Sequence, residues 1–297
     1  MALFRRRTSP APVAQEFPGL TEKEAEAFMA ELAVELDARG GGWSVEDGTL
    51  RLEGRATQYG LTNVAQMWRR SEPRDRRDVL RERLAVLDAQ HEAPEIAPAD
   101  MPALVRPQLW ALTDAGEHED ALVMLEVADD LVAVLSLDLP TTVQAVQPSE
   151  IAVIGLTEDE LWQRAVEQLD DGEAIERVAL DEDGLVEVLV SDSHFLASRV
   201  LALEELVGAL PEHGALVALP HRHLLALHHI RDTTVLDAVG VMAPFTVEQF
   251  EEGPGSLSPH LYWWHRDGLE SIEVDDVAGA INPPDSFVAM LETLPEP

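Results

Sequence analysis

The chain contains no cysteine among its 297 residues. Without thiols it can form no disulfide and no Cys-based zinc or iron–sulfur site, and it has no thiol nucleophile. No apolar run approaches the roughly 18–20 residues that a transmembrane helix needs. The N-terminal stretch MALFRRRTSPAPVAQEFPGL begins with charge but has no apolar segment after Arg7, so it does not read as a secretory signal. These absences favour a soluble, cytoplasmic protein.

Basic residues are also scarce, and Lys23 is the only lysine beside twenty arginines. The net charge is -35, and its distribution is uneven: residues 1–83 hold 14 basic and 14 acidic side chains, whereas residues 84–297 hold 7 and 42. Such a field repels nucleic acids and anionic membranes. It attracts basic proteins and speeds encounter with them. We therefore expect a basic protein partner or self-association; the alternative is that the charge only keeps the protein soluble.

Two segments open with the same helix-capping pattern, GLTEKEAEAF at 19–28 and GLTEDELWQR at 155–164. In each, a threonine stands three residues before a glutamate, as in a capping box. Apolar residues then recur at helical spacing, which predicts two helices. Since 46% of the residues are hydrophobic, a substantial core is also expected.

Turn signals predict several hairpins. One lies around Asp47-Gly48, one joins 121–127 to 131–139, one surrounds the turn at 181–184, and one passes through Asp267-Gly268. We further predict a helix over 71–90 capped by Ser71, a short strand at 151–156, a helix over 194–210 and a short helix at 285–294.

The proline-rich stretch at 92–107 is the best candidate for a linker. It separates a predicted helix–hairpin–helix region at 18–91, preceded by a disordered tail at 1–17, from an acidic α+β domain at 108–297. Because adjacent strands favour antiparallel ladders, the fold class is predicted to be α+β, with mostly antiparallel hairpins interleaved with helices. No dinucleotide-binding fingerprint or phosphate-binding loop is present, and no cofactor is expected.

The stretch ALVALPHRHLLALHHI at 215–230 contains four of the ten histidines, namely His221, His223, His228 and His229. A metal site would need three or four ligands converging at about 2.0–2.2 Å. The first two histidines lie in a turn after Pro220, and the last two would point about 100° apart around a helix, so no metal site is expected. The pattern predicts a strand, a turn and then a helix, with the apolar residues as packing.

Arg222 lies at this predicted corner, in a region that has few cations. Its fork of donors could clamp a carboxylate or a phosphate. The alternative is an exposed ion pair, which would contribute little. His221, Arg222 and His223 are therefore candidate binding residues, while no catalytic residue can be assigned.

Other motifs give weaker evidence for a functional site. Paired acids such as Asp129/Asp130 and Asp170/Asp171 fall in polar turns, where solvated carboxylates belong. The DEDG stretch at 181–184 does not complete a calcium loop, and SDSH at 191–194 lacks the elbow of a serine hydrolase.

Two exposed features suggest interaction surfaces. In a strand, Trp263 and Trp264 point to opposite faces, so one of them, taken as Trp264, is a candidate interface anchor. The arginines of the predicted helix at 74–83, which are interrupted by acids, are expected to form a solvated face. Alternatively, this helix docks onto the acidic part of the same chain or of a second copy.

The C-terminal two-thirds of the chain resembles the YtpQ-like family of bacterial proteins of unknown function. The resemblance rests on three segments: Ala165 and Leu169 in the second capped helix, Ala197 and Ser198, and the corner formed by Val217, Ala218, Pro220 and Arg222. Gln168 and His223 replace the asparagine and aspartate that are usual in the family. The resemblance implies an intracellular bacterial protein and implies no reaction.

The sequence as a whole favours a non-enzymatic acidic module that binds a protein partner or regulates it. The alternative is an enzyme acting on a small anionic substrate near the Pro220–His223 corner, at which Arg222 would bind the anion.

Overall fold

The computed structural model describes residues 17, 20–46, 48–54, 58–92, 96–116, 121–140, 142–181, 183–275 and 280–297. The chain divides into two compact units, Met1–Glu95 (unit 1) and Ile96–Pro297 (unit 2). Nearly all of the expected tail, together with Asp47 of the first hairpin, lies outside the described residues. Within them, no helix is both long and apolar enough to cross a membrane.

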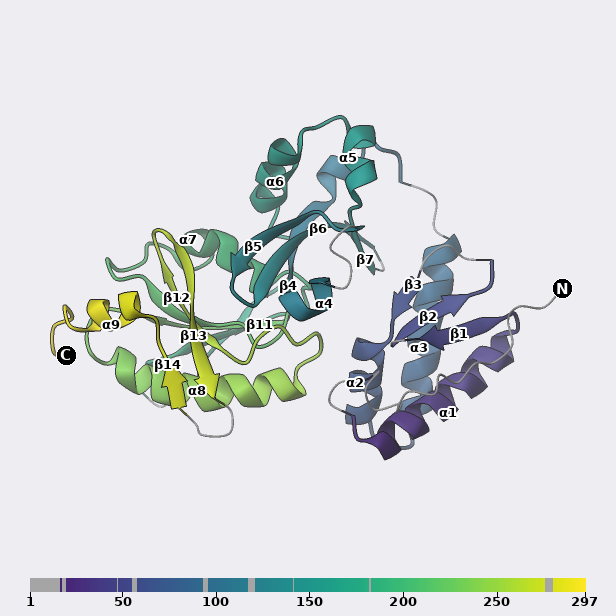
Figure 1. The fold of residues 1–297 in the computed structure, drawn as a ribbon, viewed down its shortest axis with the longest axis horizontal. Coiled ribbons are helices and arrows are strands. Elements are labelled where there is room, and N and C mark those ends of the chain that lie inside the picture. Colours follow the sequence, from purple (N-terminus) through teal and green to yellow (C-terminus); the bar gives the residue numbers. More distant parts are fainter. Residues whose placement is uncertain are drawn as a thin grey trace. The chain divides into compact units, whose positions relative to one another are not determined.

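In its described residues, unit 1 combines three helices with a three-stranded antiparallel sheet of order β1-β2-β3 (Figure 1). Its elements are α1 (Glu22–Arg39), β1 (Trp43–Glu46), β2 (Thr49–Leu52), β3 (Gln58–Gly60), α2 (Thr62–Arg70) and α3 (Arg76–Glu92). The predicted capping box is present, because the Thr21 side chain accepts from the Glu24 amide and the Glu24 carboxylate accepts from the Thr21 amide.

The core of unit 1 forms where the helices meet the sheet. Phe28 of α1 and Trp68 of α2 are fully buried, with ring centroids 5.7 Å apart. Phe17, which the sequence prediction assigned to the tail, is also buried and lies edge-on to Phe28 at 5.0 Å. Burial of an aromatic ring removes a large apolar surface from water, so Phe17 is part of the core of unit 1.

A buried carboxylate joins α1 to α3. The Glu35 side chain is only 7% exposed and lies 3.5 Å from Arg77 Nε and 3.1 Å from Arg81 Nε. The hydrogen bond to Glu35 raises the pKa of Arg81. Two arginines of the helix that was predicted to have a solvated face are therefore used inside unit 1.

Unit 2 contains a seven-stranded and a four-stranded sheet, and every strand pair among its described residues is antiparallel. The strands are β4 (Val105–Ala111), β5 (Met124–Ala128), β6 (Leu131–Leu139), β7 (Thr142–Ala145), β8 (Glu176–Ala179), β9 (Glu187–Val190), β10 (Ala215–Ala218), β11 (Leu224–His229), β12 (Leu261–His265), β13 (Gly268–Asp275) and β14 (Ala280–Asn282). The helices are α4 (Leu112–Gly116), α5 (Pro148–Ile154), α6 (Glu158–Glu167), α7 (Leu203–Val207), α8 (Val235–Glu252) and α9 (Asp285–Leu291), with 3₁₀ turns at Met101–Ala103 and Ala197–Ala202. The predicted α+β fold is confirmed.

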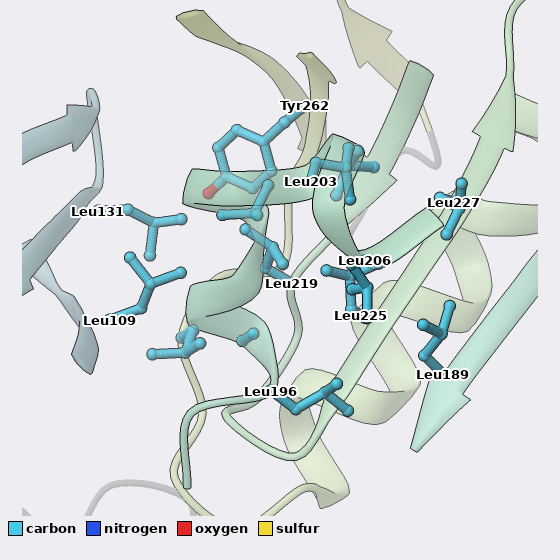
Figure 2. Packing of buried hydrophobic residues seen from close by; sticks show 14 of the residues in the cluster. Leu109, Leu131, Leu189, Leu196, Leu203, Leu206, Leu219, Leu225, Leu227 and Tyr262 are labelled. Atoms are coloured by element: carbon cyan, nitrogen blue, oxygen red, sulfur yellow. The ribbon is translucent and has the colours of Figure 1, made fainter. Parts of the chain in front are cut away.

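The larger sheet has the order β14-β13-β12-β10-β11-β9-β8, and both of its faces are covered near the centre. On one face, Val217 and Leu225 pack with the segment 196–206 and with Leu109 and Leu131 of the smaller sheet (Figure 2). On the other face, Leu216 packs with residues of α8 and α9. Successive residues of a strand point to opposite faces, so strands covered on both sides must be apolar at every position.

This two-sided burial explains the main error of the sequence analysis. Residues 224–229 form strand β11 and not the helix that was predicted after the Pro220 turn. Leu225 and Leu227 face one core, while Leu224 and Ala226 face the other. A short, uninterrupted apolar run does not distinguish a doubly buried strand from a buried helix. The stretch is therefore a strand–turn–strand hairpin.

Other boundaries also differ from the prediction. Residues 148–154 form α5 and not a strand, since Pro148 occupies its first turn, Gln147 and Glu150 form a capping box, and Gly155 ends it with positive φ. The segment predicted as one helix over 194–210 contains a 3₁₀ turn and the short α7, which Gly208 ends. Val105 and the two residues after it, expected in the linker, belong to β4.

The start of α3 also needs correction. The helix begins at Arg76, and Ser71 instead ends α2 by donating its hydroxyl to the Met67 carbonyl. Ser71, two residues before Pro73, is therefore not the N-cap of α3. Its hydroxyl is already hydrogen-bonded to the last turn of α2.

One acid of the β5–β6 turn connects the two sheets of unit 2. The Asp130 carboxylate accepts from the Tyr262 hydroxyl at 2.8 Å and from the Ser258 hydroxyl at 2.6 Å. Both donors belong to fully buried side chains, and burial raises the pKa of Tyr262 well above its usual value, with the Asp130 charge acting in the same direction. The sequence analysis had placed this acid among solvated turn residues, and the structure corrects that assignment.

Replacing Asp130 with alanine should lower the free energy of unfolding by about 2–4 kcal/mol, because two buried hydroxyls lose their acceptor. Urea denaturation measures this change. The neighbouring Asp129 is exposed, and Asp129→Ala should stay within about 0.5 kcal/mol of the wild type. Equal losses in the two variants would contradict the proposed role of the Asp130 carboxylate.

Candidate functional site

The turn between β10 and β11, at residues 220–223, is the strongest candidate site, and we call it the corner. Backbone hydrogen bonds hold it from three other segments. The Pro220 carbonyl accepts from Leu257 N at 2.8 Å, and the Arg222 carbonyl accepts from Ala197 N at 3.1 Å. The His223 carbonyl accepts from Ser191 N at 3.2 Å. The corner is therefore a fixed part of the fold.

Three imidazoles meet at the corner. The ring centroid of His223 lies 5.1 Å from that of His194 and 6.3 Å from that of His221. His221 is buried, His223 is partly buried and His194 is exposed. The structure thus brings together two motifs that the sequence analysis treated separately, SDSH at 191–194 and PHRH at 220–223. In the sequence, the predicted hairpin at 175–191 was the signal that could have placed the SDSH motif beside a neighbouring strand end, because its second strand ends at Ser191.

The Arg222 guanidinium forms no ion pair and no side-chain hydrogen bond within the part of the chain that the structure describes. Burial lowers its pKa, and the charge of Asp114 acts in the opposite direction. By contrast, Arg106 lies 2.9 Å from Asp138 and Arg199 lies 3.4 Å from Asp170. Burying a cation that has no ion pair costs free energy, so the Arg222 guanidinium is less well stabilised than the paired arginines of this unit.

Two glycines leave the space that these side chains fill. A Cβ on Gly255 would lie 2.0 Å from Arg222 Nε, and a Cβ on Gly253 would lie 1.8 Å from His221 Cδ2. Gly255 also has a φ of +72°, which favours glycine. The loop after α8 is thus shaped to let the imidazole and the guanidinium lie against its backbone.

His223 has an unusual environment. Its Nδ1 is buried and has no hydrogen-bond partner among the described residues. Burial lowers the pKa of His223 and the Arg222 charge adds to this, while backbone hydrogen bonding to Ser193 and Ser191 and the charge of Asp192 oppose it. A neutral imidazole at this position can donate or accept a proton at one nitrogen, and it becomes a cation only at an additional cost.

The other residues that the sequence singled out are used structurally. Ser193 donates its hydroxyl to Asp171 and accepts from Phe195 N, so it is not poised as a nucleophile. Asp181 accepts three backbone N–H bonds in the β8–β9 turn, and these bonds lower its pKa.

The remaining histidines of the stretch lie at the opposite end of β11 from the corner. His228 Nδ1 lies 2.8 Å from the Leu185 carbonyl, to which it must donate, and His229 lies on the other face of β11. Within the described ranges, no group of three or more histidine or acidic side chains is placed to hold a metal ion.

Trp264 does not have the exposure expected of an interface anchor. It points to the face opposite Trp263, as predicted. There it packs against the core that Val217 shares with the segment 196–206, and it donates its Nε1–H to the Val200 carbonyl at 3.2 Å. Trp263 likewise donates to the His213 carbonyl at 2.8 Å. Because the sheet is covered on both faces, both indoles are partly buried.

Unit 1 has a cavity of about 230 Å³, which is lined in part by Leu36, Trp43 and Leu87. The cation at its rim, Arg39, is bound to Asp88 at 3.3 Å and donates to two backbone carbonyls. Since that charge is already used, we regard the corner as the better candidate site.

Replacing Gly253 with alanine should lower the free energy of unfolding by about 1–3 kcal/mol, because the new methyl group would overlap the His221 ring and lie 2.6 Å from the Gln249 carbonyl oxygen. The Gly253 φ of -72° is compatible with alanine, so the cost comes from packing alone. Gly240→Ala, in an open position of α8, is the control and should be neutral or stabilising by up to about 1 kcal/mol. Thermal unfolding of both variants tests the fit, and a neutral Gly253→Ala would refute it.

The lowered pKa of His223 predicts a pH dependence. Below a pH of about 6.5 the unfolded chain binds a proton that the folded His223 resists, so stability should fall as pH drops from 7.5 to about 5.5. His223→Gln should reduce this slope without abolishing it, because burial also lowers the pKa of His229, whereas His213→Gln, outside the corner, should keep it. The measurement is the urea midpoint as a function of pH; identical slopes in all three proteins would exclude the proposed environment.

Comparisons with protein-family models, with curated proteins and with solved structures find no match for this chain. The resemblance to the YtpQ-like family therefore stays a prediction. Most of the positions that carry it are core positions here: Ala165, Ala197 and Val217 are buried. Arg222 is the exception, because it is partly exposed.

Proposed function

We propose that this protein is a non-enzymatic binding module of the cytoplasm, and that its acidic unit 2 binds a basic protein partner. The observation that carries the proposal is the segregation of charge between the units. Unit 2 holds 7 arginines, no lysine and 39 acidic residues, for a net charge of -32, whereas unit 1 holds 14 basic and 17 acidic residues.

Internal pairing cannot account for these acids. With 7 cations for 39 carboxylates, most acids of unit 2 have no arginine in that unit to pair with. Arg106, Arg177 and Arg199 each pair with one acid, and such partly exposed pairs contribute little stability. The remaining charge forms a field that repels nucleic acids and anionic membranes and attracts lysine- and arginine-rich surfaces.

A separate partner is favoured over docking of the chain's own arginine helix. Arg77 and Arg81 of α3 already bind Glu35, and Arg81 also binds Asp78 at 2.8 Å. Releasing them would leave the buried Glu35 carboxylate unpaired, at a cost of a few kcal/mol. Self-association through these two side chains is therefore less favourable than binding a protein that supplies its own cations.

The second candidate is an enzyme that acts on a small anionic substrate near the Pro220–His223 corner. The Arg222 guanidinium, which has no ion pair among the described residues, favours it, because such a group suits an anionic substrate. A reaction would further need an acid or base at the substrate, for which His223 is the nearest candidate.

Immobilised full-length protein should retain basic proteins, with isoelectric points above about 9, and release them as salt is added, because exposed charge pairs are screened. The identified partner is then titrated against the wild type and against a variant in which Glu204, Glu205, Glu251 and Glu252 are changed to glutamine. These four side chains are exposed in unit 2. Affinity and its salt dependence should both decrease.

The control changes the exposed Glu22 and Glu26 of unit 1 to glutamine and should have a smaller effect per charge. Binding that is insensitive to salt, or that weakens equally in both variants, would argue against unit 2 as the binding surface.

A further inference from the structure

Arg222 differs from the other arginines of unit 2. Arg106, Arg177 and Arg199 form ion pairs, and Arg164, Arg231 and Arg266 are exposed to water. Arg222 alone combines partial burial with the lack of an ion pair in the described part of the chain. Acids outnumber cations more than fivefold in this unit, and the charge of Asp114 is felt at Arg222 without forming an ion pair with it, so the lack of an ion pair needs a physical reason.

We propose that the corner is a binding site for a small oxyanion, a carboxylate or phosphate group, which the Arg222 guanidinium holds and the imidazole of His223 assists. A guanidinium presents a planar fork of N–H donors that matches two oxygens of either group. Among the described residues, the buried Nδ1 of His223 has no hydrogen-bond partner, although the backbone of Ser193 and Ser191 interacts with this imidazole. This nitrogen is a second observation that points to a polar ligand.

The access and the rigidity of the corner fit a binding site. His194 is exposed and both Arg222 and His223 are partly exposed, so the corner borders on solvent. Backbone hydrogen bonds from Arg222 N to Gly255 O and from Ala197 N to Arg222 O fix the residue on both sides. The missing Cβ of Gly255 leaves room for the guanidinium. The donors are thus held in place before a ligand arrives, which lowers the entropic cost of binding.

The charge of unit 2 sets the specificity of such a site. A net charge of -32 disfavours anions in general, so an oxyanion can stay only where direct hydrogen bonds offset the repulsion. The site goes beyond the proposed basic partner, because it needs a ligand of opposite charge and does not depend on the acidic surface. Either proposal can fail while the other stands.

The test is thermal unfolding of the full chain with inorganic phosphate or acetate as the probe, each compared with chloride at equal ionic strength. Phosphate, acetate or both should raise the melting temperature in a saturable way, and the ion that acts identifies the class of oxyanion. Arg222→Gln should weaken the apparent affinity about tenfold or more.

Arg231→Gln is the matched control, because it removes one positive charge from an exposed position of the same unit. It should keep the wild-type response. The same stabilisation in wild type and Arg222→Gln would be a general salt effect and would overturn the proposal, as would a wild type that responds to neither probe.

A second measurement does not depend on a variant that folds. The Nε–Hε signal of Arg222 in ¹⁵N-labelled wild-type protein should shift with saturation as the active ion is added. If this signal stays unchanged while the general amide spectrum is intact, the site does not exist.

Discussion

The burial of β10 and β11 on both faces is the constraint on which the rest of unit 2 depends. Their side chains enter two different cores, one shared with the smaller sheet and the other with α8 and α9. Polar side chains are therefore excluded from most of both strands and gather at their ends. The turn that joins these strands is one such end, which is why three polar residues, His221 to His223, follow one another there. The position of the candidate site is thus a consequence of how the core is packed.

Electrostatics separates three kinds of charged residue in this chain. Glu35 and Asp130 are partly or fully buried, and each is satisfied by two donors from other elements. Most other acids are solvated and need no partner. Arg222 belongs to neither class, because it is partly buried and unpaired in the described structure. Native proteins rarely leave a polar group in that state without a reason, so function is best sought at this residue.

Local patterns in the sequence predicted the elements whose signals are local. The capping boxes at Thr21 and Thr157 and the hairpin at Asp267-Gly268 depend on residues a few positions apart, and all three are present. The identity of 224–229 depended on whether two cores cover the segment, which no local pattern reveals. The same holds for the candidate site. Arg222 could be proposed from its position in the sequence. The approach of His194 to His223 and the lack of an ion pair at Arg222 in the described structure depend on contacts between residues far apart in the sequence. The same is true of the hydrogen bonds of Asp130 to Ser258 and Tyr262.

The order of strands in the large sheet has a kinetic consequence. Strand β10 pairs with β11 through a short turn, but its other neighbour is β12, and the register sets Val217 opposite Tyr262. The whole of α8 lies in the chain between these partners. Closing so long a loop costs entropy before any contact across it can form, and such non-local pairing slows folding. We therefore expect the local β10–β11 hairpin to form before the β10–β12 ladder.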